Sequence, residues 1–594
     1  MKTRKLIVLV TLFALALCLS ACRAEEDPLG NIQDAMTDTS GMDFSYSNED
    51  INNSVSETYT TITWTDTDVT ITGAGAIAEE GHVTITSAGD YLLTGVSKDA
   101  SLQIAVGEKD KVTLLLSGVH LTNPKGAVLY GSSGKKVTLH SLPNTENTFT
   151  DGGTRTAEME QVDATIFVRG DLTLKGEGVL TIRGNHAHGV VTKDDLVVTG
   201  GTYDIEAVKT ALNGHDSVKI SGGTFTLQAG TNAISSDTVE DTAKGYISID
   251  GGAFRITAGT DGIQAETVLN ISGGSFSIRT GGGSNAYSNS SAKGLKASGD
   301  ILISGGSFHI DSADDAIHAN NCISISGGAL TLSSADDGVH ADTALDISGG
   351  TLTITKSYEG LESADILIRG GVISVTASDD GLNAGGGNDG SALGRPGAGG
   401  FHDVDNNASL TITDGYLLID ASGDGLDSNG SLTITGGITL VSGPTNGGNG
   451  AMDYGATAKI SGGVLIATGS SGMATNFSEA DGQGAILTSF STVSGGSSIA
   501  ICDENGVVIA SFTPSKSYQS VVVSAPEIQK GGTYTIVVGG TVQNADANGH
   551  ATQSTITGGT TLASITMTSL LYGNGGMGGG MPGGGGGGGR PPRW

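Results

Sequence analysis

Leu345-Asp-Ile-Ser-Gly-Gly-Thr-Leu-Thr-Ile354 is one copy of a pattern that recurs along most of the chain. A short apolar strand precedes each Gly-Gly pair and a second strand follows it. The pairs that begin at Gly305, Gly327 and Gly349 are 22 residues apart, and the next pair, at Gly370, follows after 21. Apolar residues alternate within each segment without helical spacing, which predicts short strands. A fixed period in this range is typical of stacked repeats, so we predict an all-β solenoid of ~22-residue coils.

One apolar position recurs in every coil, two residues after the Gly-Gly pair. If each coil climbs one strand spacing, about 4.8 Å, equivalent residues stack parallel to the axis. Because side chains alternate across a strand, these residues point inward and form core, and the alternative of a sugar-stacking platform is disfavoured. The column comprises Phe225, Phe254, Phe276, Phe308, Leu330, Leu352 and Ile373.

The composition narrows the class of protein. With 96 glycines and 5% aromatic residues, the chain suits turn-rich β structure. Its formal net charge of −32 argues against a nucleic-acid partner, because proteins that bind nucleic acid present basic surfaces. The charge therefore reflects either a solubilising surface or carboxylates that bind a cation.

The first 22 residues are predicted to be a bacterial lipoprotein signal peptide. Lys2, Arg4 and Lys5 precede the apolar stretch 6–17, which is short for a spanning helix. Leu19-Ser-Ala-Cys22 resembles a lipobox, so we expect Cys22 to be lipidated and to anchor the exported protein at the outer face of the cell membrane. An ordinary signal peptide with a chance cysteine is the alternative. We expect no other membrane contact.

The rest of the chain divides by composition and strand pattern. Cys322 and Cys502 remain after export and form no disulfide framework. Asp503-Glu-Asn-Gly506 predicts a hairpin turn within long alternating strands. We expect a monomer made of a flexible tether (23–58), N-terminal coils and cap (59–163), regular coils (164–484) with a loop insertion (385–407), a C-terminal antiparallel β cap (485–573) and a disordered glycine-rich tail (574–594).

The second corner of each coil carries acidic residues in two neighbouring columns. The first column contains Asp261, Asp315, Asp337, Glu359, Asp380 and Asp424. The second column contains Gln264, His318, His340, Glu362, Asn383, Asp427 and Asp453.

Carboxylates stacked roughly 5 Å apart repel one another unless a cation lies between them. Lys293 and Lys296 occupy one coil only, where we expect the column to be interrupted. Ca²⁺ suits such oxygen-rich corners because it accepts six to eight oxygen ligands in flexible geometry. We therefore predict calcium ligands at Asp261, Asp315, Asp337, Glu359, Glu362, Asp380, Asp424, Asp427 and Asp453.

Two structural alternatives apply to these corners. Asp-Gly is good turn chemistry without any metal, although turns do not require Glu359 or Glu362. His318 and His340 follow Asp pairs and could be catalytic, but we favour corner imidazoles bonded to the next coil.

The chain resembles the secreted clostridial carbohydrate-binding domain-containing β-helix proteins. The resemblance is carried by 69–73, 83–93, 112–119 and 144–152, and by Ile271-Ser-Gly-Gly with its following Asp-Gly corners. It spans roughly residues 55–540. It implies a right-handed parallel β-helix like that of pectate lyases, bound Ca²⁺, and non-catalytic binding of cellulose and polygalacturonate.

Three functions are compatible with these patterns. We favour a polysaccharide-binding protein that takes an acidic or cellulosic ligand. A pectate-lyase- or polygalacturonase-like enzyme is the second hypothesis, with Arg279 or Arg369 as the base of a lyase. It is weaker because a repeating column offers no singular site. A calcium-stabilised spacer or adhesin is the third.

Overall fold

The computed structural model describes residues 28–66, 68–286, 290–385 and 408–573. The signal peptide with Cys22, residues 386–407 of the insertion and the tail 574–594 lie outside the described residues. Within the described ranges, no helix combines the length and apolarity that a membrane span requires.

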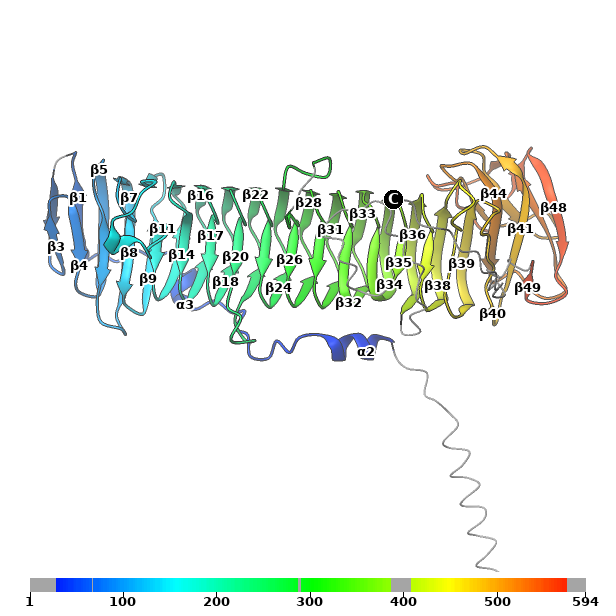
Figure 1. The fold of residues 1–594 in the computed structure, drawn as a ribbon, viewed down its shortest axis with the longest axis horizontal. Helices are drawn as coiled ribbons and strands as arrows, with labels where there is room; N and C mark the ends of the chain where they lie inside the picture. The colour runs from blue at the N-terminus through cyan, green and yellow to red at the C-terminus, as the bar shows by residue number, and fades with distance from the viewer. Residues whose placement is uncertain (1–27, 67, 287–289, 386–407, 574–594) are drawn as a thin grey trace, which may run out of the picture.

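The fold is an elongated stack of coils (Figure 1), and strands three apart in the chain pair with one another, which gives three strands per coil. Strand β16 (Thr202–Ala207) pairs in parallel with β13 (Val179–Gly184) on one side and β19 (Thr224–Ala229) on the other. The same step of three strands repeats along the stack. Each coil therefore adds one strand to each of three faces, as the period predicts for a solenoid. The parallel pairing already begins with β1 (Thr60–Trp64) and β5 (Gly89–Ser97) and continues from β5 to β7 (Lys111–Asn123), well before residue 164, where we expected the regular coils to start.

We name the three faces by what lies on them. The open face contains β10 (Glu146–Asp151), β13, β16, β19, β22 (Ala253–Ala258), β25 (Ser275–Thr280), β28 (Ser307–Ser312), β31 (Ala329–Ser334) and β33 (Thr351–Lys356). The strapped face contains β9 (Lys136–Ser141), β12 (Asp171–Gly176), β15 (Asp195–Val198), β18 (Ser217–Ile220), β21 (Tyr246–Ile249), β24 (Val268–Ile271), β27 (Asp300–Ile303) and β30 (Cys322–Ile325). The corner face contains β8 (Leu129–Ser133), β11 (Ala164–Val168), β14 (His188–Thr192), β17 (Leu212–Gly214), β20 (Ile234–Ser236), β23 (Ile263–Ala265), β26 (Leu295–Ala297), β29 (Ile317–Ala319), β35 (Leu382–Ala384) and β37 (Leu426–Ser428).

Towards the C-terminal end, single strands bend from one face onto the next. These longer strands are β32 (Val339–Ile347), β34 (Leu361–Ala377), β36 (Ser409–Ala421), β38 (Ser431–Ser442) and β39 (Ala458–Gly469). They keep the parallel register of the coils before them.

The predicted apolar column is confirmed as the core of the open face. Phe225, Phe254, Phe276 and Phe308 stack with ring centroids 4.6–4.7 Å apart and nearly parallel planes, and all four are buried. The Gly-Gly corner permits this packing. Gly252 has φ +110°, and a Cβ there would meet the Phe254 ring at 3.0 Å.

Both ends of the stack are closed by antiparallel pairing. At the N-terminal end, β1 (Thr60–Trp64) pairs with β2 (Val69–Thr72), and β3 (Ala76–Glu79) pairs with β4 (His82–Ile85). Strand β6 (Leu102–Ala105) pairs in parallel with β4. At the C-terminal end, β44 (Tyr518–Ala525) lies between β39 and β41 (Gly484–Val493).

A separate small sheet covers the C-terminal end. It contains β42 (Ile499–Cys502), β43 (Val508–Phe512), β45 (Thr533–Val538) and β48 (Thr560–Thr566). The turn 503–506 joins β42 to β43 as a hairpin, as its sequence predicts. Four two-residue strands complete this end. Strand β40 (Glu479–Ala480) pairs with β39, β49 (Leu571–Tyr572) pairs with β41, and β46 (Thr541–Val542) pairs with β47 (Ile556–Thr557). The one-turn helix η1 (Ala157–Met159) lies in the connection between β10 and β11.

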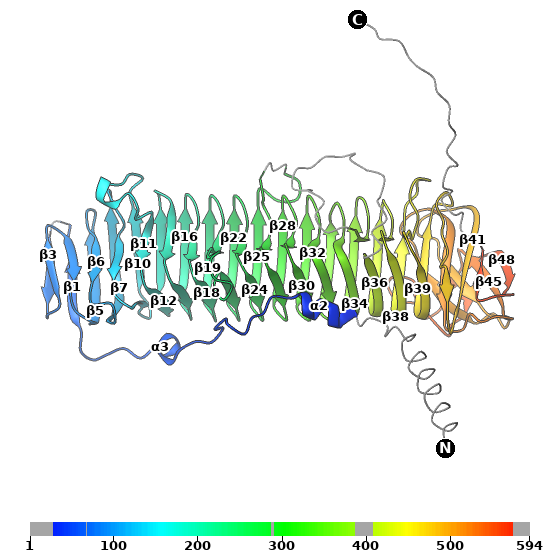
Figure 2. The same ribbon diagram turned by 60° about the horizontal axis from the view of Figure 1, so that its bottom comes forward.

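The prediction of a flexible tether is wrong for residues 28–58, which form a strap along the strapped face. The strap contains α2 (Pro28–Ala35) and α3 (Asn48–Ile51) and runs back towards the N-terminal end of the stack (Figures 1 and 2). Ile32 packs against Cys322, Ala344 and Leu367. Met42 likewise packs against Tyr246 and Val268, so two buried residues of this polar segment enter apolar patches of the coils.

Lysines of the strapped face bind the strap by ion pairs and by its backbone carbonyls. Lys175 Nζ donates to the carbonyl oxygens of Glu49 and Asn52 at 2.7 and 2.8 Å. Lys136 Nζ lies 2.5 Å from Asp50 Oδ1, and Thr173 donates to the same oxygen at 2.6 Å. Burial raises the pKa of Asp50, but these donors together with Ser47 outweigh it and lower the pKa to about 2. The strap therefore supplies counter-charges that buried lysines need.

We expect Asp50→Asn to loosen the strap locally. The variant removes a charge-assisted hydrogen bond worth about 1.5–3 kcal/mol, which corresponds to roughly 10–100-fold faster hydrogen exchange around α3. Because the folded pKa lies below that of an unfolded aspartate, about 3.9, the contribution of Asp50 is present above pH 4 and is lost as the pH falls towards 2. Hydrogen-exchange mass spectrometry checks both effects. Asp38→Asn, at an exposed strap position, should leave the exchange unchanged; equal exchange in the two variants would contradict the role of Asp50.

Candidate functional site

The two acidic columns stack at the edge of the corner face in the predicted register. In the second column, Gln264, Lys296, His318 and His340 are direct partners on β23, β26, β29 and β32. Glu362, Asn383 and Asp427 continue it on β34, β35 and β37. A bridge between Leu426 and Met452 places Asp453 next to Asp427.

Residues of the first column also bind the backbone of the coil that follows. Asp315 Oδ1 accepts the amide of Asp337 at 3.0 Å, and Asp337 Oδ1 accepts that of Glu359 at 3.1 Å. Asp261 Oδ1 accepts the amide of Lys293 at 2.9 Å. Asn232, which we did not predict, begins this series by accepting the amide of Asp261 at 3.1 Å. One oxygen of these carboxylates therefore serves the corner turn, and the other is left for a cation.

At the N-terminal part of the columns, lysine supplies that cation. Lys293 Nζ lies 2.6 Å from Asp315 Oδ2 and 3.0 Å from Asp314 Oδ1, and Lys296 Nζ lies 3.6 Å from Asp261 Oδ2. Burial opposes ionisation of Asp315, but Lys293 and His318 outweigh it and lower its pKa well below the usual range. At this coil, where we expected an interruption, Asp261 and Asp315 of the neighbouring coils each have a basic partner.

In the middle of the columns, histidine lies among the acids. His318 Nδ1 lies 2.8 Å from Asp315 Oδ2. His340 Nδ1 lies 3.2 Å from Asp337 Oδ2 in its own coil and 2.9 Å from Glu362 Oε2 in the next coil. We expected both imidazoles to bond to the next coil. His340 contacts the next coil through Glu362, but both histidines also contact an aspartate of their own coil.

At the C-terminal part of the columns, three carboxylates lie close together. Oxygens of Asp380, Asp424 and Asp427 lie within 4.8 Å of one another, and no lysine, arginine or histidine of the described residues forms an ion pair with Asp380 or Asp424. Burial and the adjacent carboxylates raise the pKa of Asp380 to about 8. Burial likewise raises the pKa of Asp424 to about 7. The buried Oδ1 of Asn383 has no hydrogen-bond partner among the described residues. This all-oxygen set fits a hard divalent cation.

The middle of the columns is too buried to contact a polysaccharide. Asp315, Asp337 and Glu362 are at most 3% exposed. The open face, in contrast, leaves every second residue exposed or partly exposed on successive strands, from β19 through β33. Arg255, Ser277 and His309 form one outward column on this face. Among the described residues Arg255 has no carboxylate partner.

Arginines considered for a lyase are already engaged. Arg369 donates to both oxygens of Asp346, at 2.8 and 2.9 Å. Arg279 pairs with Asp311 and with the carbonyl of Gly282. Each guanidinium is therefore paired with an aspartate that lies outside the two acidic columns.

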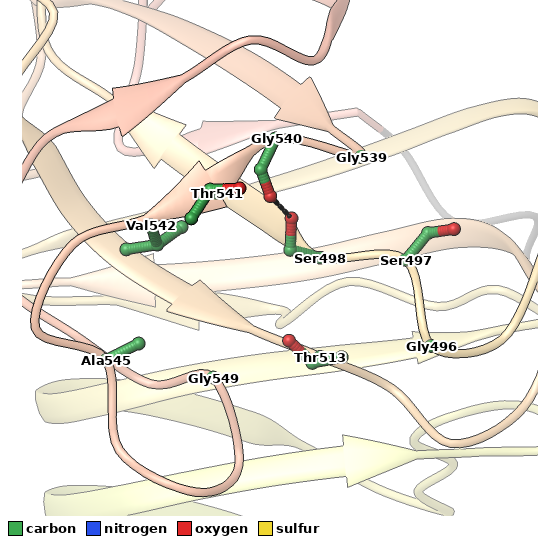
Figure 3. Close-up of a pocket in the computed structure, with 10 residues that line it drawn as sticks. All are labelled: Gly496, Ser497, Ser498, Thr513, Gly539, Gly540, Thr541, Val542, Ala545 and Gly549. Atoms are coloured by element: carbon green, nitrogen blue, oxygen red, sulfur yellow. Dashed lines mark hydrogen bonds between the residues drawn. The ribbon is translucent and has the colours of Figure 1, made fainter.

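A cavity of about 350 Å³ lies in the C-terminal sheet region (Figure 3). Glycines and small side chains line it, and Ser498 donates to the carbonyl of Gly540 at its wall. It contains no acidic, basic or thiol side chain, so it offers no acid–base chemistry.

The fold and the site together define the class of protein. It is a stack of parallel β coils with an acidic edge that is largely buried and one exposed, polar sheet face. Residues 79–338 match the model of the family described as carbohydrate-binding domain-containing protein. Over these residues the chain is similar to the carbohydrate-binding domain-containing proteins.

The chain is also similar to one curated protein and one solved structure. A carbohydrate-binding domain-containing protein of Acetivibrio thermocellus is 34% identical over 136 residues, which are 22% of this chain and 48% of the relative. The chain thus spans about half the length of that relative. A solved structure described as a polysaccharide lyase-like protein from C. thermocellum is 30% identical; the match covers 41% of this chain and 97% of that one, with a TM-score of 0.38.

Proposed function

We propose that the protein binds polysaccharide on its open face without cleaving it. The observation that carries this proposal is the contrast among the three faces. The strap covers much of the strapped face, the corner face ends in buried ionic columns, and the open face presents exposed polar side chains over consecutive coils. A flat, regularly spaced surface of this kind suits an extended chain of repeating sugars.

The ligand we favour is an acidic polysaccharide such as polygalacturonate, with cellulose as the neutral alternative. Arg255 can donate two parallel hydrogen bonds to a sugar carboxylate. It has no competing carboxylate partner among the described residues, and the phenylalanines that a cellulose platform would use are buried in the core. A local cationic site also explains how a chain of net charge −32 could hold a polyanion.

We further propose that Ca²⁺ stabilises the coils at Asp380, Asp424 and Asp427, with Asp453 beside them. These residues would hold the ion through carboxylate oxygens. Calcium neutralises charge there as Lys293 does at the other end of the columns. Its role is structural, because the sugar-binding face lies on another side of the coil.

Three further parts of the proposal concern export and shape. The lipidated Cys22 would hold the protein at the outer face of a bacterial membrane, with no other membrane contact. The coils would wind as a right-handed parallel β-helix, and the protein would act as a monomer.

Calorimetric titration with polygalacturonate, and in parallel with a soluble cellulose oligomer, tests the proposal. We expect binding without release of unsaturated or reducing ends. Arg255→Ala should weaken polygalacturonate binding about 10-fold, the loss expected for a hydrogen bond to a charged group. Arg169→Ala removes the same charge from an exposed corner and should have no effect.

Each other outcome selects a different function. Release of unsaturated ends would establish a lyase, and release of reducing ends a hydrolase. Binding that is equally affected by both arginine variants would reflect charge alone and would refute the open-face site. No binding to either polymer would favour the spacer hypothesis.

A further inference from the structure

His340 is buried among three carboxylates. It lies on β32 and is 2% exposed, as Asp337 is 1% and Glu362 3% exposed. Its Nδ1 faces Asp337 Oδ2 and Glu362 Oε2, and its Nε2 lies 3.2 Å from Asp342 Oδ1. Both ring nitrogens therefore face acceptors.

A neutral imidazole among ionised carboxylates cannot satisfy this arrangement. If Nε2 carries the proton and donates it to Asp342, Nδ1 presents a lone pair towards two carboxylate oxygens. The contact is favourable if the ring takes a second proton, if one of the two carboxyl groups is protonated and donates to Nδ1, or if a cation lies at Nδ1. Donation from Nε2 to a carboxylate is also the arrangement that fixes the tautomer of a metal-ligating histidine.

Charge and hydrogen bonding favour the cation. Counting the two carboxylates at Nδ1, an imidazolium leaves one net negative charge in a buried site, whereas a divalent ion with a neutral His340 leaves none; the partly exposed Asp342 adds one negative charge in either case. Glu362 Oε2 has no hydrogen-bond partner among the described residues although it is buried. The lysine that neutralises Asp315 does not pair with Asp337 or Glu362.

The spacing of the donors fits a coordination sphere. Ligand atoms bound at about 2.0–2.2 Å and at angles of 90–110° lie about 2.9–3.5 Å apart. The Nδ1 of His340 is 2.9 Å from Glu362 Oε2 and 3.2 Å from Asp337 Oδ2. The three donor atoms lie within 4.8 Å of one another.

We propose that His340 Nδ1, Asp337 Oδ2 and Glu362 Oε2 bind one first-row transition metal ion such as Zn²⁺. Imidazole nitrogen selects such ions, whereas all-oxygen sites select Ca²⁺. The edge of the corner face then holds three kinds of cation along one axis: lysine, a nitrogen-liganded metal, and calcium. The site does not depend on the proposed sugar binding, so either proposal can fail alone.

Cobalt binding tests the site because Co²⁺ reports its ligands by visible absorption. The purified protein is stripped with a chelator, dialysed, and titrated with Co²⁺ in excess Ca²⁺. We expect one equivalent to give ligand-field bands that Zn²⁺ abolishes. His340→Gln should remove the bands, and Asp342→Asn, which keeps all three ligands, should weaken Co²⁺ binding about 10–100-fold.

A matched control separates this site from other histidines. His309→Gln changes an exposed histidine on β28 and should leave the spectrum unchanged. If His340→Gln does not fold, Asp342→Asn still decides the question. Absent bands in the wild-type protein, or bands that survive in both variants, would overturn the proposal and leave His340 as an imidazolium counter-ion.

Discussion

Lys293→Met is expected to lower the free energy of unfolding by about 3–5 kcal/mol, the cost of leaving buried charge without its partner. Lys293 is 6% exposed and lies between Asp314 and Asp315, which are 7% and 0% exposed. Burial opposes its charge, but these two carboxylates outweigh burial and raise its pKa. Methionine keeps most of the volume and removes only the charge.

Denaturant titration in the presence of a chelator measures the effect. The triple variant Lys293→Met, Asp314→Asn, Asp315→Asn should recover most of the loss, because no buried charge remains uncompensated. Lys98→Met, at an exposed position, serves as the control and should change stability little. A loss below about 1 kcal/mol for Lys293→Met would contradict the assignment of Lys293 as the counter-ion.

In the presence of a chelator, stability is expected to fall as the pH rises from about 4 to 8. The pKa values of Asp380 and Asp424 are raised to about 8 and 7 in the folded protein, above that of an unfolded aspartate, about 3.9. The folded state therefore holds more protons than the unfolded state between these values. Its contribution is complete below pH 4 and is lost as the pH rises through 7 and 8.

Calcium should remove this dependence because the ion replaces the protons. At 100 times its Kd, a ligand that binds only the folded state adds about 2.7 kcal/mol. Calorimetric unfolding at pH 5 and pH 8, with Ca²⁺ and with a chelator, gives the four values required. We expect the calcium effect to be large at pH 8 and small at pH 5.

Two variants assign that effect to its site. Asp424→Asn should reduce the calcium response and weaken the pH dependence. Asp414→Asn changes an exposed residue close in sequence and should preserve both. A calcium response that persists unchanged in Asp424→Asn would place the ion elsewhere.

The acidic residues of the columns could have a structural role or a catalytic role, and these two roles require different environments. Asp315 and Asp337 are buried and bound to backbone amides, lysine or histidine, which is the environment of structural groups. A hydrolase needs a pair of acids that a sugar can reach. The proposed binding face lies on a different sheet, so metal and sugar can be tested by separate substitutions.

The sequence by itself determined the repeat and everything that follows its period. Because each coil adds one strand spacing, residues one period apart become neighbours, and the phenylalanine stack and both acidic columns could be predicted from their positions. The single coil with lysine was also visible, although its effect on neighbouring coils was not.

Contacts between parts of the chain that share no period were decided only by the tertiary structure. Asp50 meets Lys136 across 86 residues, and Ala35 accepts a hydrogen bond from Asn321 across 286. No fixed spacing in the sequence relates these partners. The sequence of the strap, which is polar and contains few apolar residues, therefore predicts a tether. The charge balance of the columns also depends on the tertiary structure. Whether a carboxylate needs a metal depends on which side chains of adjacent coils contact it. The period determines which residues stack along the axis but not which groups of adjacent coils each side chain contacts.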